Sequence, residues 1–205
     1  MKKSIIALAT ALLTSSAYSA DYLITSDSAP TGVNNTLTMY YETTFNLVGN
    51  GLKVGDYLPG TKLTSQALSE YDTSDNNEKV RIFSVLASVD TPVCNQQARE
   101  LSNFVDNNST LLKDIEFIAL SADTPFAQQR FIQTEKISDK LTFLSDSKNH
   151  SFGMKSGTQI SELGLLARSI FVVDKQNKIV HIQRVPELTM IPDLSIAVEV
   201  AKSQI

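Results

Sequence analysis

Residues 80–105 read VRIFSVLASVDTPVCNQQARELSNFV, and the rest of the chain is organised around them. The first part is a dense run of β-branched and aromatic residues, which is typical of a buried central strand. In the second part Asp90 or Thr91 can serve as a helix N-cap, and Pro92 then occupies the first helical position. Apolar or small residues recur at helical spacing from there on, at Cys94, Ala98, Leu101 and Val105. The stretch therefore predicts a core strand followed by a helix whose first turn carries Cys94.

Cys94, the only cysteine of the chain, is thereby placed where a helix N-terminus stabilises an anion. The thiolate is such an anion, and it is the form of cysteine that attacks electrophiles. The hydroxyl of Thr91, three residues upstream, can be directed to the same spot. Position alone leaves a second interpretation open, because most free cysteines are small buried apolar residues on a helix face.

The composition is that of an ordinary soluble globular protein. Hydrophobic residues make up 42% and charged residues 20% of the 205 positions, which is enough for one domain with a full core. We find no internal repeat and no linker to a second domain. The formal net charge is −4, and the loss of Lys2 and Lys3 with residues 1–20 would make it −6. An acidic protein of this kind has no basic patch for nucleic acid or anionic lipid.

Residues 1–20 have the pattern of a secretory signal peptide. Lys2 and Lys3 form a basic start, residues 4–13 are apolar but too few to span a bilayer, and residues 15–20 are mostly small and polar. An uncleaved membrane anchor is the alternative. The pattern predicts a bacterial protein exported to the periplasm, without membrane contact once the signal is removed.

The signal cleavage bond has more than one candidate. Cleavage after Ala17 or Ser19 would place small residues at positions −3 and −1, whereas cleavage after Ala20 would place Tyr18 at −3.

Exported proteins usually pair their cysteines. A lone Cys94 in an oxidising compartment therefore indicates a reactive thiol or an intermolecular pair.

The N-terminal third is expected to be the least regular part. Residues 21–42 are polar and predict a loose arm with one edge strand at most. Residues 43–48 and 52–54 flank the sequence Gly-Asn-Gly at 49–51, which predicts a β-hairpin. A polar loop with weak helical character is expected over residues 65–77.

The remainder predicts strands alternating with helices. We expect strands at 61–64, 115–120 and 141–144, helices at 125–133 and 152–154, a hairpin of strands 169–173 and 178–182, and a last helix opened by Pro192. Strands separated by helices imply parallel crossovers, and the late hairpin adds antiparallel strands. The predicted fold is α/β: a thioredoxin-like mixed β-sheet with flanking helices and an N-terminal β-hairpin, formed by a single domain over residues 43–205.

Four segments of the chain resemble segments of the peroxiredoxins, and in particular of the bacterial thiol peroxidases, and they occur in the same order as in that family. They are SVDTPVC at 88–94, SADTPFAQQRF at 121–131, LGLLAR at 163–168, and ELT at 187–189 followed by Pro192 and Asp193. The likeness covers residues 44–201. It implies a peroxidase that reduces hydrogen peroxide or organic hydroperoxides, uses no metal or organic cofactor, and forms a homodimer.

Carried onto this sequence, the resemblance implies roles for three residues. Cys94 would be the peroxidatic cysteine, which attacks the O–O bond as a thiolate and becomes a sulfenic acid. Thr91 would orient the thiolate and the peroxide through its hydroxyl. Arg168 would stabilise the thiolate and the negative charge that moves along the peroxide oxygens.

The chain departs from the family pattern at two positions. Ala87 stands where the family motif begins with a proline that shields the cysteine. Ile132 stands where the family has its usual resolving cysteine, so no intramolecular disulfide can form. The expected enzyme is therefore a one-cysteine peroxidase, with an external thiol or a thiol-disulfide protein as reductant. The alternative is a catalytically weakened module that senses redox state or binds a partner.

Other chemistries find little support in the sequence. His150 and His181 are the only histidines and lack the spacing of metal ligands, and either would be an unsupported partner for a cysteine hydrolase. The single cysteine rules out a C-x-x-C thiol-disulfide oxidoreductase. We find no glycine-rich loop of the kind that binds phosphate.

Overall fold

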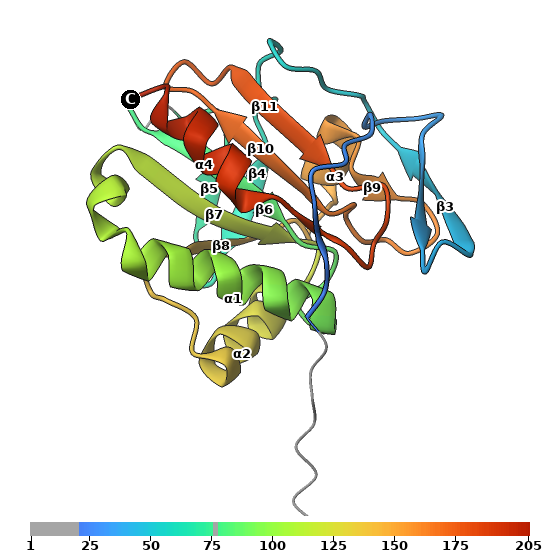
Figure 1. The fold of residues 1–205 in the computed structure, drawn as a ribbon, viewed down its shortest axis with the longest axis horizontal. Coiled ribbons are helices and arrows are strands. Elements are labelled where there is room, and N and C mark those ends of the chain that lie inside the picture. Colours follow the sequence, from blue (N-terminus) through green and yellow to red (C-terminus); the bar gives the residue numbers. More distant parts are fainter. Residues whose placement is uncertain (1–20, 76–77) are drawn as a thin grey trace, which may run out of the picture.

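The structure is a computed structural model that describes residues 21–75 and 78–205; the predicted signal peptide, residues 1–20, lies outside the described residues. A seven-stranded mixed sheet forms the centre (Figure 1). Strands β6, β7 and β8 are parallel, whereas β10 and β4 run antiparallel to their neighbours. The spatial order is β11 (Ile179–Arg184), β10 (Ser169–Val173), β6 (Val80–Val85), β7 (Ile115–Ser121), β8 (Thr142–Ser145), β4 (Lys62–Ser65) and β5 (Glu70–Asp72).

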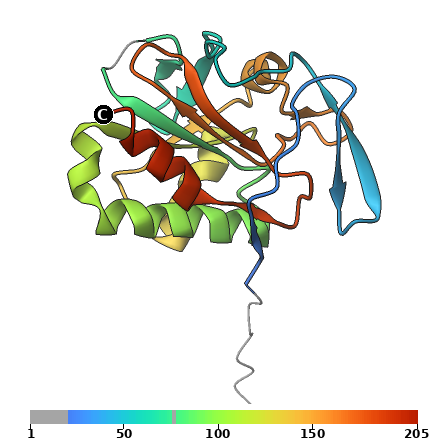
Figure 2. The same ribbon diagram turned by 45° about the horizontal axis from the view of Figure 1, so that its top comes forward.

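Helices cover both faces of this sheet (Figures 1 and 2). One face packs against α1 (Pro92–Asn107), α2 (Pro125–Glu135) and α4 (Leu194–Lys202), which contribute Ala98, Phe131 and Ala197 to one apolar cluster. The other face packs against α3 (Ser151–Ser156). A short 3₁₀ helix, η1 (Ser109–Lys113), follows α1. The predicted α/β class and the mixed sheet with flanking helices are confirmed.

Strand β6 is buried along its whole length, as its sequence predicts. Successive side chains of a strand point to opposite faces of the sheet. Ile82 accordingly belongs to the apolar cluster under α1, while Phe83 and Val85 belong to the cluster beside α3. The polar Ser84 lies on the face of Ile82 and is therefore directed toward α1.

Two local predictions need correction. The last helix begins at Leu194 rather than at Pro192, because Asp193 is the N-cap and accepts hydrogen bonds from the backbone N–H groups of Ser195 and Ile196. Pro192 instead lies in β12 (Ile191–Pro192), which pairs in parallel with β1 (Ile24–Thr25). The polar segment 65–77, expected to be a loop with weak helical character, contains strand β5, which pairs with β4 at the edge of the sheet.

The N-terminal hairpin exists, but the prediction that residues 52–54 form its second strand is wrong. Strand β3 (Thr43–Val48) pairs with the preceding β2 (Thr36–Met39) and with β9 (Gln159–Ile160), not with residues 52–54. The Gly-Asn-Gly sequence serves another contact, since a Cβ atom on Gly49 would collide with the carbonyl of Met154 in α3. Gly49 therefore permits a close approach of two backbones rather than a hairpin turn.

Residues 21–42 are more ordered than their polarity indicates. Besides β1 and β2, this segment is held by two buried side chains of β11. Gln183 donates to the carbonyls of Thr25 and Asp27, and Arg184 donates to those of Pro30 and Thr36. Burial lowers the pKa of Arg184 to about 10, which still leaves it charged at neutral pH. The segment is thus fastened to the sheet by long-range hydrogen bonds.

The start of the described chain passes the N-terminal end of α1 (Figures 1 and 2). Gln96 of α1 accepts a hydrogen bond from the backbone N–H of Tyr22 at 2.7 Å and donates to the carbonyl of Tyr22 at 3.3 Å. Residues 21–42 therefore contact both β11, the edge strand of the sheet, and the helix that carries Cys94.

Candidate active site

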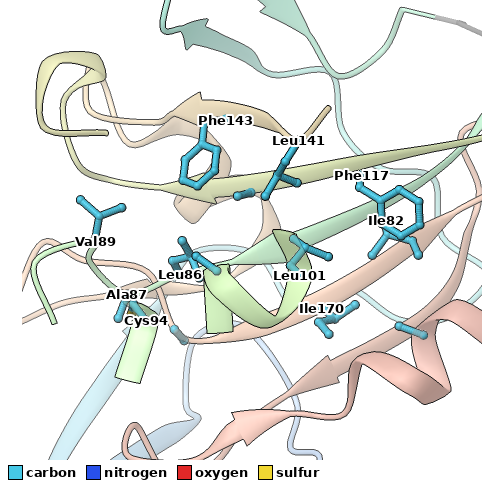
Figure 3. Packing of buried hydrophobic residues seen from close by; sticks show 14 of the residues in the cluster. Ile82, Leu86, Ala87, Val89, Cys94, Leu101, Phe117, Leu141, Phe143 and Ile170 are labelled. Atoms are coloured by element: carbon cyan, nitrogen blue, oxygen red, sulfur yellow. The ribbon is translucent and has the colours of Figure 1, made fainter. Parts of the chain in front are cut away.

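Cys94 lies in the first turn of α1, directly after the central strand. Thr91 is the N-cap, with an extended backbone (φ −111°, ψ 140°), and Pro92 occupies the first helical position. The Cys94 side chain is 0% exposed and lies among Leu86, Ala87 and other buried apolar residues (Figure 3). The backbone N–H of Ser88 donates to its sulfur at 3.4 Å. The site thus supplies a hydrogen-bond donor to the sulfur in an environment from which water is excluded.

Thr91, the second predicted site residue, borders the same turn. Its side chain makes no capping hydrogen bond to the helix, and its hydroxyl donates to the carbonyl of Ser88 at 3.0 Å. This hydrogen bond must break before the Thr91 hydroxyl can donate to the sulfur or to a peroxide oxygen. In the structure Thr91 therefore closes the turn 88–91, in which Ser88 contacts Cys94.

Asp123, in the loop that follows β7, holds this turn, a role that its sequence context does not predict. Oδ1 accepts from the Ser88 hydroxyl at 2.9 Å, and Oδ2 accepts from the backbone N–H of Val89 at 2.8 Å. The cap of α2 is Thr124, whose side chain accepts from the backbone N–H of Ala127. Because β6 and β7 are parallel neighbours, their carboxyl ends meet, and this geometry could have indicated Asp123 as a partner of the cysteine turn.

We expect Asp123→Asn to loosen the cysteine turn. An amide keeps one acceptor oxygen but presents an NH₂ group to the second donor, so one charge-assisted hydrogen bond is lost, at a cost of about 1.5 kcal/mol. Local opening would become roughly tenfold more populated, and alkylation of the buried Cys94 by iodoacetamide should accelerate accordingly.

Asp90→Asn is the matched control for this prediction, because it removes the same charge from an exposed position of the same turn. It should leave the alkylation rate within about twofold of the wild type, as is usual for surface changes. Equal alkylation rates for the two variants would show that Asp123 does not restrain the turn.

Arg168, the third predicted site residue, is fully buried on the same side of the sheet as α1. It directly precedes β10, and the alternation of that strand places it on the face of Ile170 and Val172, which belong to the cluster under α1. Its Nη1 donates to Oε1 of Gln97 at 2.6 Å, and its Nη2 donates to the carbonyl of Leu188 at 3.1 Å. The structure thereby brings Arg168 to the helix of Cys94.

The segment that accepts from Arg168 is itself held by a buried carboxylate, Glu187. This side chain accepts hydrogen bonds from Thr38 at 2.6 Å, from Thr189 at 2.6 Å, and from the backbone N–H groups of Tyr40 and Tyr41. Burial opposes ionisation, but the hydrogen bonds from Thr189 and Thr38 outweigh it and lower the pKa of Glu187. Glu187 therefore joins the tip of the β2–β3 hairpin to the carbonyl that positions Arg168.

A cavity of about 630 Å³ opens beside the cysteine turn, between the start of α1 and α2. It is lined by the turn and first helical residues Val89, Asp90, Thr91, Pro92, Asn95 and Arg99, and by Ala127, Arg130, Phe131, Thr134 and Glu135 of α2. Cys94 itself does not line it. A small reactant could approach the turn through this cavity, but contact with the sulfur requires the turn or the first helical turn to open.

The two departures from the family pattern occupy different surroundings. Ala87 is buried in the apolar cluster that contains Cys94, where its side chain is smaller than that of the family's proline. Ile132 is half-buried on α2 and packs against the same cluster. An apolar side chain at 132 thus has a packing role, and it supplies no thiol to Cys94.

Residues 21–75 and 78–205 contain no group of three or more His, Cys, Asp or Glu side chains placed to hold a metal ion. Over the same ranges no helix has the length and apolar character needed to cross a membrane.

Fold and site together define a thioredoxin-like protein with one buried cysteine at the start of its central helix and a buried arginine brought to that helix. The Redoxin family model matches residues 53–200. A thiol peroxidase of Bacillus subtilis is 40% identical over 157 residues, which cover 77% of this chain and 91% of that protein. A thiol peroxidase of Listeria innocua is 38% identical over 156 residues, covering 76% and 92%.

Two solved structures have the same fold as this chain. A peroxiredoxin-like protein from Aquifex aeolicus matches with a TM-score of 0.76 and 29% identity, over 85% of this chain and 99% of that one. A thiol peroxidase from Chromobacterium violaceum has the same fold, with a TM-score of 0.72 at 18% identity, over 83% and 97%. The chain belongs to the Redoxin family and is a peroxiredoxin of the bacterial thiol peroxidase type.

Proposed function

We propose that this thiol-dependent peroxidase works by a one-cysteine route through Cys94. The observation that carries the proposal is that the single cysteine of the chain lies at the start of a helix and accepts a backbone hydrogen bond at its sulfur. A helix N-terminus and a backbone N–H donor both stabilise a negative charge that is placed beside them. The thiolate is the nucleophile that the reaction requires.

In the first step the Cys94 thiolate attacks the outer oxygen of a hydroperoxide. An S–O bond forms and the O–O bond breaks, so that the sulfur is oxidised to a sulfenic acid and the peroxide leaves as water or an alcohol after taking up a proton. Thr91 orients the reactants, and Arg168 stabilises the negative charge that moves onto the leaving oxygen. These roles are the ones that the family resemblance implies, and they are supported by the place of Thr91 in the cysteine turn and by the contact of Arg168 with α1.

The second step needs a thiol from outside the chain. A thiol condenses with the sulfenic acid to give a mixed disulfide and water, and a second thiol then releases the Cys94 thiolate and carries away the disulfide. Hydrogen peroxide and organic hydroperoxides are both proposed as substrates, and the reductant is a small thiol or a thiol-disulfide protein. The absence of a thiol at 132 supports this external route.

The reductant step can be tested by mass spectrometry. Reduced protein treated with one equivalent of hydrogen peroxide and then with a substoichiometric thiol should carry that thiol as a mixed disulfide on Cys94. Excess thiol should restore turnover. Continued peroxide consumption with no thiol present would refute the one-cysteine route, and a peroxide rate no faster than that of a free thiol would favour a redox-sensing or partner-binding module.

We also propose that the protein is exported to the periplasm and acts there as a homodimer. The export proposal rests on the basic, apolar and small-residue pattern of residues 1–20. Cell fractionation, with the mass of the mature N-terminus, tests it.

The dimer proposal follows from the family and is supported by the exposed aromatic ring of Phe126 at the start of α2, which a partner could cover. Analytical ultracentrifugation of the reduced protein tests it.

A further inference from the structure

Residues 21–25, which we call the strap, connect strand β12 to the start of the cysteine helix (Figures 1 and 2). Its last two residues form β1, which pairs in parallel with β12. The backbone N–H of Ile191 donates to the carbonyl of Leu23 at 2.8 Å, and the buried Gln183 donates to the carbonyl of Thr25 at 2.6 Å. This end of the strap is therefore fixed to β11 and β12.

The other end of the strap is bound by the side chain of Gln96, two residues after Cys94 on α1. A backbone N–H only donates and a carbonyl only accepts. Oε1 of Gln96 therefore faces the N–H of Tyr22 at 2.7 Å, and Nε2 faces the Tyr22 carbonyl at 3.3 Å. Nε2 also donates to Glu100 at 2.9 Å, one turn further along the helix. The amide oxygen and both amide hydrogens are thus used, and two of these three bonds go to the strap.

Little apolar packing accompanies this contact. The side chains of Leu23 and Ile24 are 69% and 56% exposed, so they are not buried against the helix. A cavity of about 560 Å³ lies between the strap and α1, and Arg99 and Asn103 line it on the helix side. The strap is held on α1 by the hydrogen bonds of one side chain, and a contact of this kind can open without disruption of the core.

Gln96 directly follows the part of α1 that must unwind to expose the sulfur. Cys94 is 0% exposed and lies in the first turn of the helix. The N–H of Asn95 closes this turn by donating to the carbonyl of Thr91 at 3.0 Å. Helix ends fray from the terminus inward. A residue that is fixed to another segment at position 96 therefore opposes the unwinding that would uncover Cys94.

We propose that the strap restrains the start of α1 and thereby controls access to Cys94. While Tyr22 is bound to Gln96 the first helical turn stays closed over the sulfur, and release of the strap lets the turn open. This inference rests on the proposed function of Cys94, because the reactants that the strap admits are those of the peroxidase. The two partners are 74 positions apart in the sequence.

Gln96→Met tests the restraint through the accessibility of the cysteine. Methionine keeps the length of the side chain and a high helix propensity, but it cannot bond to Tyr22. Alkylation of the reduced protein by iodoacetamide should accelerate about five- to tenfold, because the first helical turn opens more often. The midpoint of global unfolding in urea should stay close to that of the wild type, since the change affects a local opening.

Asn103→Met is the matched control. Asn103 lies two turns after Gln96 on the same side of α1 and lines the same cavity, but in the described part of the chain it makes no hydrogen bond to the strap. Its alkylation rate should remain within about twofold of the wild-type rate. Equal acceleration in Gln96→Met and Asn103→Met would overturn the proposal.

Tyr22→Pro tests the same contact from the strap. Proline has no N–H, so the hydrogen bond to Oε1 of Gln96 is lost while the helix keeps its sequence. This variant alone should accelerate alkylation about threefold or more. Combined with Gln96→Met it should add less than about twofold, because the two changes break one interaction. No acceleration by Tyr22→Pro, or two accelerations that multiply in the double variant, would overturn the proposal.

The alkylation cycle uses no peroxide, so it separates this proposal from the proposed function. A wild type without peroxide turnover, but with coupling between Tyr22 and Gln96, would refute the peroxidase route and leave the restraint by the strap standing. Full wild-type turnover without this coupling would refute the restraint alone.

Discussion

Replacing Cys94 with serine is expected to lower the rate constant for hydrogen peroxide by at least about 10³-fold, to the level of a protein without a thiol. Serine retains the size and the hydrogen bond from the Ser88 N–H but offers a hydroxyl that is not ionised at neutral pH. The chain has no other cysteine that could take over. Stopped-flow measurement of peroxide loss by the reduced protein, with sulfenic acid trapped in parallel, checks this result.

Fold stability should be almost unaffected by this change, which makes the comparison clean. The sulfur is buried among apolar residues, and serine loses only a modest apolar contact. Thermal unfolding of the variant within a few degrees of the wild type is the control. Peroxide loss that persists in folded Cys94→Ser protein would show that the chemistry lies elsewhere in the chain.

Replacing Arg168 with methionine is expected to have the second-largest effect, a loss of about 10²–10³-fold in the peroxide rate constant. The guanidinium is fully buried, and its removal takes away the positive charge that is hydrogen-bonded to Gln97 on the helix of Cys94. Methionine fills most of the vacated space, so the loss reflects charge more than packing. Stopped-flow rate constants of the reduced variant and the reduced wild type at pH 7 measure this loss.

The same substitution should also cost stability, because Gln97 Oε1 would be left buried without a donor. An unsatisfied buried acceptor costs about 1–3 kcal/mol, which urea denaturation can measure. Arg168→Lys is the informative companion, since lysine keeps the charge but cannot reach Gln97 and Leu188 with a planar fork. We expect it to recover part of the rate. A methionine variant that reacts within threefold of the wild type would remove Arg168 from the proposed site.

The β2–β3 hairpin depends on a partner that is distant in the sequence. Its loop, residues 40–42, begins with Tyr40 and Tyr41, which both have positive φ (56° and 58°) although neither is a residue type that favours this conformation. Their N–H groups are held by Glu187, 146 residues or more away along the chain. Nothing near Tyr40 in the sequence indicates that partner, whereas the Gly-Asn-Gly at 49–51 is a strong local turn signal.

Arg168 illustrates the same limit in the site. The sequence placed it before a buried strand, and the family resemblance assigned it a role. Its contact with Gln97 joins residues 71 positions apart, and the selection of Gln97, rather than the adjacent Gln96, depends on which face of α1 packs on the sheet. Asp123 is a similar case, because its partner Ser88 follows the adjacent parallel strand and is 35 positions away in the sequence.

The sequence by itself determined the central strand, the helix with Cys94 in its first turn, the parallel crossovers and the late hairpin. These features arise from periodicity, caps and turn residues, which act over a few neighbouring positions. Only the tertiary structure decided that β3 pairs with β2, that Arg184 and Gln183 fasten residues 21–42, and that Gln97 and Asp123 hold the surroundings of Cys94. The physical reason is that buried polar groups must find partners wherever the packed elements bring them, and those partners are distant in the chain.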